Sequence, residues 1–332
     1  MRKEIMAEST SKGDYLIGVD LGGTKILAGV FDSGLTCLGR AKLSTKHERG
    51  AEEVIGRIAR CVKDAVDECD LDLKQVRAVG IGAPGTVDTE AGRVIFAPNL
   101  QWEDVALKKS LEKQLGVPVF VENDANAAVL GVYEAELGAK PRDVIGIFLG
   151  TGIGGGIIVD GKLYSGFNGT AGEIGHMVLQ VGGPKCNCGS RGCFEALASR
   201  TAIFRKLSEA VSAGKKTLLT DALGADLKDL RSGDLRKAIK KGDKLVEQII
   251  EEAAEYTGVA VANLINLMSP QVVVLGGGVI DALGEEMMAV VLETAQDYSL
   301  AAAFKGVEIV ASKTGDDAGI TGGAVLARRQ SK

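Results

Sequence analysis

Three thiols and one imidazole lie close together between residues 172 and 195. Cys186, Cys188 and Cys193 follow a Cys-x-Cys-x4-Cys spacing, and His176 precedes the first of them by ten residues. Thiolates and an imidazole separated by turns rich in Gly, Pro and Asn form the ligand set of a closed tetrahedral zinc site. Because four protein ligands leave no position for water, the predicted zinc ion is structural.

Two carboxylates flank this cluster. Glu173 precedes His176 by three residues, and Glu195 follows Cys193 by two. Zinc does not need them, so both are candidates for binding a hydroxyl group of a substrate; the alternative is that both are exposed surface carboxylates. Zinc would also fix the tautomer of His176, so that its second ring nitrogen holds a defined hydrogen bond. The cluster therefore predicts one wall of a polar binding site, stiffened by metal.

Glycine-rich turns follow three apolar runs. The turns Asp20-Leu-Gly-Gly-Thr24 and Gly150-Thr-Gly-Ile-Gly-Gly-Gly156 each separate two apolar runs, which predicts two strand–turn–strand hairpins. A third turn, Gly276-Gly-Gly278, follows the apolar run 271–275. Backbone N–H groups with a threonine hydroxyl form a cradle for phosphate oxygens, and the alternative is that all three are ordinary tight turns.

These turns do not belong to the common nucleotide fingerprints. Gly150-x-Gly152-x-x-Gly155 matches the dinucleotide motif, but residues 157–163 resemble a strand where that motif needs a helix. No Gly-x4-Gly-Lys-Ser/Thr sequence occurs, which excludes a P-loop. Beside the first turn, Asp20 is a candidate for holding Mg²⁺ through water, whereas Lys25 is either a phosphate contact or a solvated strand residue.

Asp124 is the candidate general base. It follows a predicted strand at 117–121 and precedes a predicted helix at 125–137, which places it at the carboxyl end of a sheet, where α/β proteins bind ligands. An aspartate just before a helix is also a good N-cap, so both roles stay open. The neighbouring amides Asn123 and Asn126 favour the base, because several polar side chains at one strand end suit a polyol substrate.

Strands and helices alternate along the chain, which predicts an α/β fold. The first hairpin recurs about 130 residues later in the second, so we expect two similar domains that face each other across a central cleft. Helices are predicted at 51–69, 104–115, 195–213, 245–268, 285–297 and 318–329, with further strands at 40–44, 76–81, 271–275 and 307–311.

A chain of 332 residues usually forms two domains. We expect a disordered lead-in over residues 1–14. A small α/β domain is predicted over 15–122 together with the C-terminal helix 312–332. The large α/β domain is then 123–311, with its zinc-binding loop at 172–195.

Composition excludes several classes of protein. The net charge of −5 gives no electrostatic reason to bind nucleic acid or anionic lipid. No apolar run reaches the roughly 18 residues of a membrane span, and the N-terminus lacks the apolar core of a signal peptide. The other cysteines, Cys37, Cys61 and Cys69, have no framework spacing, which indicates a reducing cytoplasm and disfavours disulfides. Forty-five glycines predict many tight turns and close approaches of backbone to a ligand.

Taken together, these motifs resemble the ROK family of repressors, open reading frames and sugar kinases, and specifically its bacterial glucokinases. The resemblance runs from about Tyr15 to Ala327. Its marks are the two hairpin turns already described together with Gly82-Ala-Pro-Gly85, Ala97-Pro-Asn-Leu100, Glu122-Asn-Asp-Ala-Asn126, Glu173-Ile-Gly-His176, the run Cys186-Asn-Cys-Gly-Ser-Arg-Gly-Cys193-Phe-Glu195, and Leu275-Gly-Gly-Gly278.

The resemblance implies a fold of two ribonuclease-H-like domains of the actin and hexokinase superfamily. It implies ATP-dependent phosphorylation of a hexose, here glucose, at its 6-hydroxyl, with Mg²⁺. The catalytic base is then Asp124. The matching substrate-binding positions are Gly85, Asn99, Asn123, Asp124, Glu173, His176 and Glu195. The matching zinc ligands are His176, Cys186, Cys188 and Cys193. The matching nucleotide-binding positions are Asp20, Gly22, Gly23, Thr24, Lys25, Thr151, Gly152, Gly276, Gly277 and Gly278.

Other functions within the family stay open. A related kinase can act on fructose, mannose or an N-acetylated hexosamine, with ADP or polyphosphate in place of ATP. A sugar-responsive repressor is expected to carry a winged-helix segment before the first hairpin, for which the residues before Asp20 leave no room. One departure is visible, because this chain has Ala198-Ser-Arg200 where the family often has Ala-Ser-Gly. The resemblance also implies a cytoplasmic homodimer or homotetramer.

Overall fold

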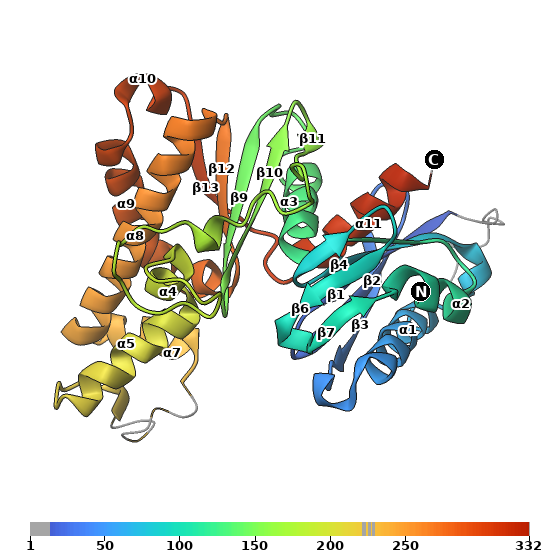
Figure 1. Cartoon of the computed structure of the whole chain (residues 1–332), viewed down its shortest axis with the longest axis horizontal. Coiled ribbons are helices and arrows are strands. Elements are labelled where there is room, and N and C mark those ends of the chain that lie inside the picture. The colour runs from blue at the N-terminus through green and yellow to red at the C-terminus, as the bar shows by residue number, and fades with distance from the viewer. Residues whose placement is uncertain (1–13, 221–223, 225–226, 228–229, 332) are drawn as a thin grey trace, which may run out of the picture. The chain divides into compact units, whose positions relative to one another are not determined.

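The structure is a computed structural model that describes residues 14–331, except 221–223, 225–226 and 228–229. It separates into two compact units (Figure 1). The first contains the described residues up to Gly138, together with Gly166–Thr170 and the residues from Asp317 onward. The second contains Ala139–Ser165 and Ala171–Asp316. Nearly all of the predicted lead-in lies outside the described residues.

The first unit is built on a mixed five-stranded sheet of order β3-β2-β1-β4-β8. Strands β1, β2 and β3 are antiparallel, whereas β4 and β8 run parallel to β1. A second sheet, β5-β6-β7, completes the unit. The strands are β1 (Tyr15–Leu21), β2 (Lys25–Phe31), β3 (Cys37–Ser44), β4 (Val76–Ala83), β5 (Thr86–Asp88), β6 (Arg93–Ala97), β7 (Trp102–Val105) and β8 (Val119–Asn123).

Helices cover both faces of this sheet. One face packs on α1 and α2 through buried aliphatic side chains, and the other packs on α11, as Figure 1 shows. Helix α3 lies directly against α11. The helices are η1 (His47–Arg49), α1 (Ala51–Asp67), η2 (Leu73–Gln75), η3 (Pro98–Leu100), α2 (Leu107–Leu115), α3 (Asp124–Ala135) and α11 (Asp317–Gln330).

The second unit repeats this sheet. Its order is β11-β10-β9-β12-β13, in which β9, β10 and β11 are antiparallel and β12 and β13 run parallel to β9. Figure 1 shows the long helices α8 and α9 beside β12 and β13. The elements are β9 (Val144–Leu149), β10 (Ile153–Val159), β11 (Lys162–Leu163), η4 (Ile174–His176), α4 (Phe194–Ala198), α5 (Arg200–Ser212), α7 (Ser232–Lys240), α8 (Lys244–Met268), β12 (Val272–Gly276), α9 (Gly278–Tyr298), α10 (Ala301–Phe304) and β13 (Glu308–Ala311).

The two sheets therefore share one topology, in which each antiparallel hairpin leads into two parallel strands. This confirms the predicted α/β class and the repeat of the hairpin. The residues after Gly152 form strand β10, which confirms that the dinucleotide fingerprint does not apply here. The sheet β5-β6-β7 was not predicted, and part of its sequence, from Asp104, was assigned to a helix that begins only at Leu107.

The unit boundaries differ from the predicted domain ranges. Helix α3, placed by the prediction in the domain that begins at residue 123, belongs to the first unit. The physical reason is its packing on α11, which allows the two backbones to approach closely at glycines. An added Cβ at Gly131 would lie 2.2 Å from the carbonyl oxygen of Ala318, and one at Gly322 would lie 1.7 Å from that of Ala127.

Glycines also bring α11 onto the sheet. A Cβ at Gly18 of β1 would lie 1.6 Å from the carbonyl oxygen of Ile320, and one at Gly80 of β4 would lie 2.0 Å from that of Gly323. The sequence predicted that the abundant glycines serve turns and ligand contacts. Several of them instead serve close packing of a helix on a sheet.

The longest helices are α8, with 25 residues, and α9, with 21. Each buries one apolar face in the core of the second unit. In the part of the chain that the structure describes, no helix combines the length and the apolar character that crossing a membrane requires.

The close approach of α3 and α11 predicts a stability effect. Gly322→Ala places a methyl group inside the contact distance of a backbone oxygen, and we expect a loss of about 2–3 kcal/mol in the free energy of unfolding. Gly56→Ala is the matched control, because Gly56 also lies inside a helix but has nothing within 4 Å of an added Cβ. The control should gain about 0.5–1 kcal/mol. Urea unfolding measures both; equal stability of Gly322→Ala and the natural chain would contradict the packing argument.

Candidate active site and metal centre

The four predicted zinc ligands form a cluster. One ligand atom from each of His176, Cys186, Cys188 and Cys193 lies within 4.8 Å of all the others. The sulfurs of Cys188 and Cys193 are 3.7 Å apart, and the Cys186 sulfur is 3.8 Å from Nδ1 of His176. A tetrahedral zinc ion with Zn–S bonds of about 2.3 Å requires roughly 3.8 Å between two sulfurs. The donor types and their spacing therefore fit zinc.

Local backbone structure assembles this cluster. Isolated bridges pair Val178 with Cys193 and Lys185 with Arg191, so that the chain folds back between the ligands. The backbone N–H of Cys186 donates to the carbonyl oxygen of Ser190 at 2.9 Å. Burial raises the pKa of the Cys186 thiol to about 12, whereas a hydrogen bond from the Ser190 backbone lowers the pKa of Cys188. The loop thus presents two buried and two exposed ligands to one point.

Glu195 connects the metal cluster to the second hairpin. Its Oε2 accepts a hydrogen bond of 3.0 Å from the backbone N–H of Ile153, and its Oε1 lies 3.8 Å from the sulfur of Cys186. An added Cβ at Gly152 would lie 2.2 Å from Oε2, so the contact requires glycine there. Glu195 is half-buried, which rules out its interpretation as a fully exposed surface carboxylate.

Glu173 differs from Glu195. It is exposed at the start of η4, and its Oε2 lies 4.0 Å from Nε2 of His176. The other ring nitrogen of His176, Nδ1, faces the Cys186 sulfur. Glu173 therefore lies beside one ring nitrogen of His176, and the Cys186 sulfur lies beside the other.

Hydrogen bonds from Thr45 and His47 to its carbonyl oxygens hold the first hairpin tip in place. The hydroxyl of Thr45 donates to the carbonyl oxygen of Gly22 at 2.7 Å, and the backbone N–H of Thr45 donates to that of Thr24 at 2.9 Å. Nδ1 of His47 lies 3.2 Å from the carbonyl oxygen of Gly23, and it must donate because a carbonyl oxygen only accepts. Three successive carbonyl groups are thus occupied, an arrangement that suits presentation of N–H groups to an anion.

The second tip is held in the same way by different residues. The carbonyl oxygen of Gly150 accepts from the backbone N–H of Arg200 at 3.0 Å, and that of Gly152 accepts from the N–H of Gly150 at 2.8 Å. The hydroxyl of Thr201 donates to the carbonyl oxygen of Thr151 at 2.7 Å. The residues that hold the two tips, Thr45, His47, Arg200 and Thr201, were not predicted as holding groups.

Asn123 and Asp124 stand at the junction of β8 and α3. The N-cap of α3 is Asn123, whose Oδ1 accepts from the N–H groups of Ala125 and Asn126 at 2.9 and 3.1 Å. Asp124 is the first residue of the helix, and its Oδ1 accepts from the N–H of Ala125 at 2.8 Å. The sequence left the N-cap and the base as alternatives for Asp124, and the structure assigns the cap to Asn123.

Glu122 stabilises the same junction through hydrogen bonds in the protein interior. It is buried, and its Oε1 accepts from the backbone N–H of Asn123 at 2.9 Å and from Nδ2 of Asn126 at 3.0 Å. Burial raises the pKa of the Glu122 carboxyl above its ordinary value. Strand β4 packs directly against this junction, because an added Cβ at Gly82 would lie 3.2 Å from the Cα of Asp124.

Other candidates of the first unit lie near this junction and the first tip. The side-chain amide of Asn123 donates to the carbonyl oxygen of Gly85 at 3.1 Å. Gly85 has φ +87°, and a Cβ there would lie 2.1 Å from the carbonyl oxygen of Phe96, so glycine is required. Asn99 is exposed on η3, with its backbone oxygen 3.6 Å from the place of a Cβ at Gly23.

Asp20 stands at the end of β1, before the first tip. It is half-buried, and an added Cβ at Gly319 of α11 would lie 2.9 Å from its carboxyl carbon. Lys25 begins β2 on the other side of the tip, and its carbonyl oxygen accepts from the N–H of Gly22 at 2.9 Å. The two charged candidates thus flank the tip.

The third glycine turn is tighter than predicted. Gly276 ends β12, Gly278 begins α9, and only Gly277 lies between them, with φ +87°. A Cβ at Gly277 would lie 2.6 Å from the carbonyl oxygen of Leu149, where β9 enters the second tip. This turn is therefore fixed against the base of that hairpin.

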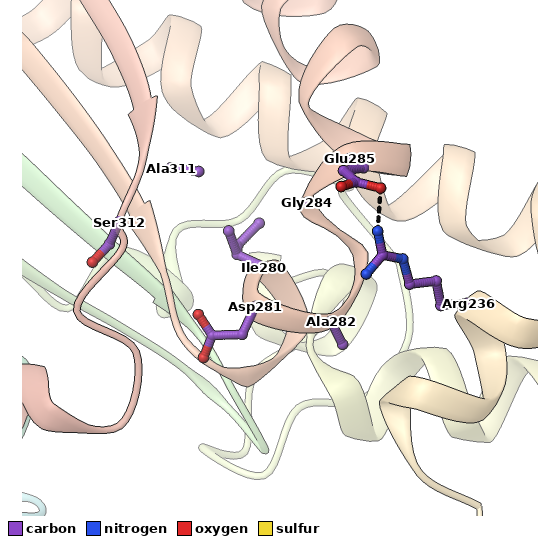
Figure 2. Close-up of a pocket in the computed structure, with 8 residues that line it drawn as sticks. All are labelled: Arg236, Ile280, Asp281, Ala282, Gly284, Glu285, Ala311 and Ser312. Atoms are coloured by element: carbon purple, nitrogen blue, oxygen red, sulfur yellow. Dashed lines mark hydrogen bonds and ion pairs between the residues drawn. The ribbon is translucent and has the colours of Figure 1, made fainter.

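A cavity of about 310 Å³ opens beside the third turn (Figure 2). Its walls are the first two turns of α9, the end of β13 and Arg236 of α7, and its polar groups include Asp281, Glu285 and Ser312. Arg236 forms ion pairs with Glu285 and, at 3.1 Å, with Glu286. These pairs hold the guanidinium at the rim of the cavity. This cavity could not be predicted from the sequence, because its walls come from three separate elements.

Comparison with known proteins shows the family of this chain. The model of the ROK family matches residues 16–330. The chain belongs to the ROK family. The prediction of family from the motifs is thereby confirmed.

Within the ROK family, the chain is similar to several glucokinases. It is 38% identical to the glucokinase of Thermotoga maritima over 95% of this chain and 98% of that protein. It is 34% identical to the glucokinase of Halalkalibacterium halodurans over 95% of this chain and 96% of that protein. A ROK family glucokinase from Streptomyces griseus, solved in complex with glucose and AMPPNP, is 36% identical with a TM-score of 0.83, and the match covers 95% of this chain and 99% of that one.

The metal cluster predicts a dependence on zinc. We expect Cys188→Ser to lose bound zinc, to lower the thermal unfolding midpoint and to raise the KM for the sugar at least about 10-fold, because the metal would orient His176 and the loop that carries Glu195. Cys37→Ser is the matched control, since Cys37 is an exposed thiol outside the cluster. Atomic absorption and thermal unfolding report on the metal independently of activity. A zinc-free Cys188→Ser protein with unchanged midpoint and KM would contradict the prediction.

Proposed function

We propose that this chain phosphorylates glucose with ATP and releases glucose 6-phosphate and ADP. The observation that carries the proposal is the Asn123–Asp124 junction, where a carboxylate that is not the helix cap is fixed by hydrogen bonds and close packing. A solved glucokinase of similar fold holds glucose and AMPPNP, which supports both the acceptor and the donor.

Asp124 acts as the general base in this proposal. It accepts the proton of the sugar 6-hydroxyl while that oxygen attacks the γ-phosphorus and the bond from this phosphorus to the β–γ bridging oxygen breaks. In the first unit, Gly85, Asn99 and Asn123 are assigned to bind the sugar. In the second unit, Glu173, His176 and Glu195 have the same assignment. Carboxylate, amide and imidazole groups discriminate between sugars through individual hydroxyl groups.

Zinc has a positioning role in this proposal. Bound by His176 and the three thiols, it supplies a rigid centre that fixes the histidine ring and the loop that carries Glu195. The bond from Ile153 to Glu195 then relates the orientation of this carboxylate to the second hairpin tip.

The nucleotide is assigned to the glycine turns. Gly22, Gly23, Thr24, Thr151 and Gly152 are proposed to bind phosphate oxygens, with Lys25 beside them. Asp20 is proposed to hold Mg²⁺ through water, since Mg²⁺ retains several waters and prefers carboxylates.

The nucleoside is assigned to the cavity of Figure 2, which is lined by the start of α9, the helix that follows Gly276 and Gly277 and begins at Gly278. Its volume of about 310 Å³ lies within the range of small-molecule sites. Asp281 and Glu285 can accept hydrogen bonds from ribose hydroxyls or an exocyclic amine. The planar guanidinium of Arg236 offers a surface on which a base can stack.

A coupled assay tests the function. Glucose, fructose, mannose and two N-acetylated hexosamines are compared, with ATP, ADP and polyphosphate as donors. We expect the highest kcat/KM for glucose with ATP. Turnover of another hexose without turnover of glucose would overturn the substrate assignment and leave the kinase class. The predicted homodimer or homotetramer remains a separate prediction.

Asp124→Asn tests the base in the same assay. The amide keeps the size and the bond from Ala125 but cannot accept the proton, so we expect kcat to fall at least about 100-fold with an unchanged unfolding midpoint. A rate near that of the natural chain would remove Asp124 from the mechanism.

Arg236→Ala tests the nucleoside cavity. We expect the KM for ATP to rise about 3- to 10-fold, because a stacking surface is lost, with an unchanged KM for glucose. Lys237→Ala is the control, since Lys237 follows on the same helix and pairs with Asp234 at 3.2 Å. An unchanged KM for ATP in Arg236→Ala would place the nucleoside elsewhere.

A further inference from the structure

One cation at the second hairpin tip has no role in the function proposed above. Arg200 is the first residue of α5. Its backbone N–H donates to the carbonyl oxygen of Gly150 at 3.0 Å, and its guanidinium donates to Oγ1 of Thr151 at 2.5 Å. Main chain and side chain of one residue therefore both bind the turn.

The charge of Arg200 has no counter-ion in the described part of the chain. The hydroxyl of Thr151 is the one protein group there that its guanidinium contacts, although a guanidinium carries five N–H donors. Arg205 on the same helix provides a contrast, because it pairs with Glu209 at 3.0 Å and donates to the carbonyl oxygen of Ala196 at 3.1 Å. Arg200 thus keeps most of its donors for another acceptor.

Around the turn that Arg200 contacts, the acceptors already hold hydrogen bonds; Oε2 of Glu195, for example, accepts from the backbone N–H of Ile153. The carbonyl oxygens of Gly150, Thr151 and Gly152 already accept hydrogen bonds from the protein. Because Oγ1 of Thr151 accepts from Arg200, its own hydroxyl hydrogen is directed elsewhere and can donate to an anion. A guanidinium, a hydroxyl and a glycine turn with occupied carbonyl groups together match the oxygens of a phosphate.

We propose that the guanidinium of Arg200 binds the polyphosphate chain of the nucleotide at the Gly150–Gly152 turn. This inference rests on the proposed kinase function and adds a residue of the second tip that contacts the substrate. Arginine binds phosphate through two parallel N–H groups, so the contact contributes both charge and orientation. It strengthens with the number of phosphate groups that the ligand carries.

Three substitutions separate charge from structure. Arg200→Gln keeps a donor for Thr151 and removes the charge, Arg200→Lys keeps a charge without the planar fork, and Arg205→Gln removes an equal charge from the same helix. We expect Arg200→Gln to raise the KM for ATP about 10- to 100-fold and Arg200→Lys to raise it less, with the KM for glucose unchanged within about 2-fold. Arg205→Gln should behave as the natural chain.

A purely structural role of Arg200 gives a different outcome. If the side chain only holds the turn, Arg200→Gln will match the natural chain, or the KM for glucose and the unfolding midpoint will change together with the KM for ATP. Either result overturns the inference, as does an equal effect of Arg205→Gln.

Calorimetric titration with ATP, ADP and AMP provides a readout that does not need turnover. Arg200→Gln should weaken the binding of ATP and ADP more than that of AMP. If the natural chain binds no ATP, the proposed kinase function fails together with the inference. If it binds ATP and Arg200→Gln binds it equally well, the role of Arg200 alone is overturned.

Discussion

Hydrogen bonds to the carbonyl groups of two hairpin tips are the constraint on which the candidate site depends. In each tip, three successive carbonyl oxygens accept from the protein, through Thr45 and His47 in one and mainly through Arg200 and Thr201 in the other. A glycine turn by itself has many conformations available. With its carbonyl groups occupied, the turn keeps one conformation. The repeated fold thus provides the same preorganised turn twice, with different residues performing the same task.

A second constraint is the close packing around α11 and α3. Where side chains would separate the backbones, Gly18 and Gly80 let α11 touch the sheet, and Gly322 lets it touch α3. The first turn of α3 is fixed by this contact, by its close approach to Gly82, and by hydrogen bonds from Ala125 to Asn123 and from Asn123 to Glu122. The backbone of Asp124 therefore occupies a position determined by packing and hydrogen bonds, which is the support that precise positioning of a carboxylate needs.

The loop that carries the candidate metal ligands is ordered in a different way. Residues 177–193 contain few apolar side chains, so a hydrophobic core cannot fix them. Three thiols and an imidazole converge instead, and a metal bound there would supply the missing order. Glu195 extends this order to the second tip through Ile153. In the second unit, bonds to a metal would thus orient Glu195. In the first unit, closely packed backbones orient Asp124.

What the sequence determined by itself was local in origin. The candidate zinc ligands lie within one loop, the hairpins within single apolar–turn–apolar runs, and the order of strands and helices follows from side-chain periodicity. Only the tertiary structure decided that Asn123 is the cap and not Asp124, that Thr45 and Arg200 hold the tips, and that sheet β5-β6-β7 and the cavity beside α9 exist. The contacts of Thr45 with Gly22 and of Arg200 with Thr151, like the walls of the cavity, join residues far apart in the chain, and no local pattern of residue types marks which distant partners will meet.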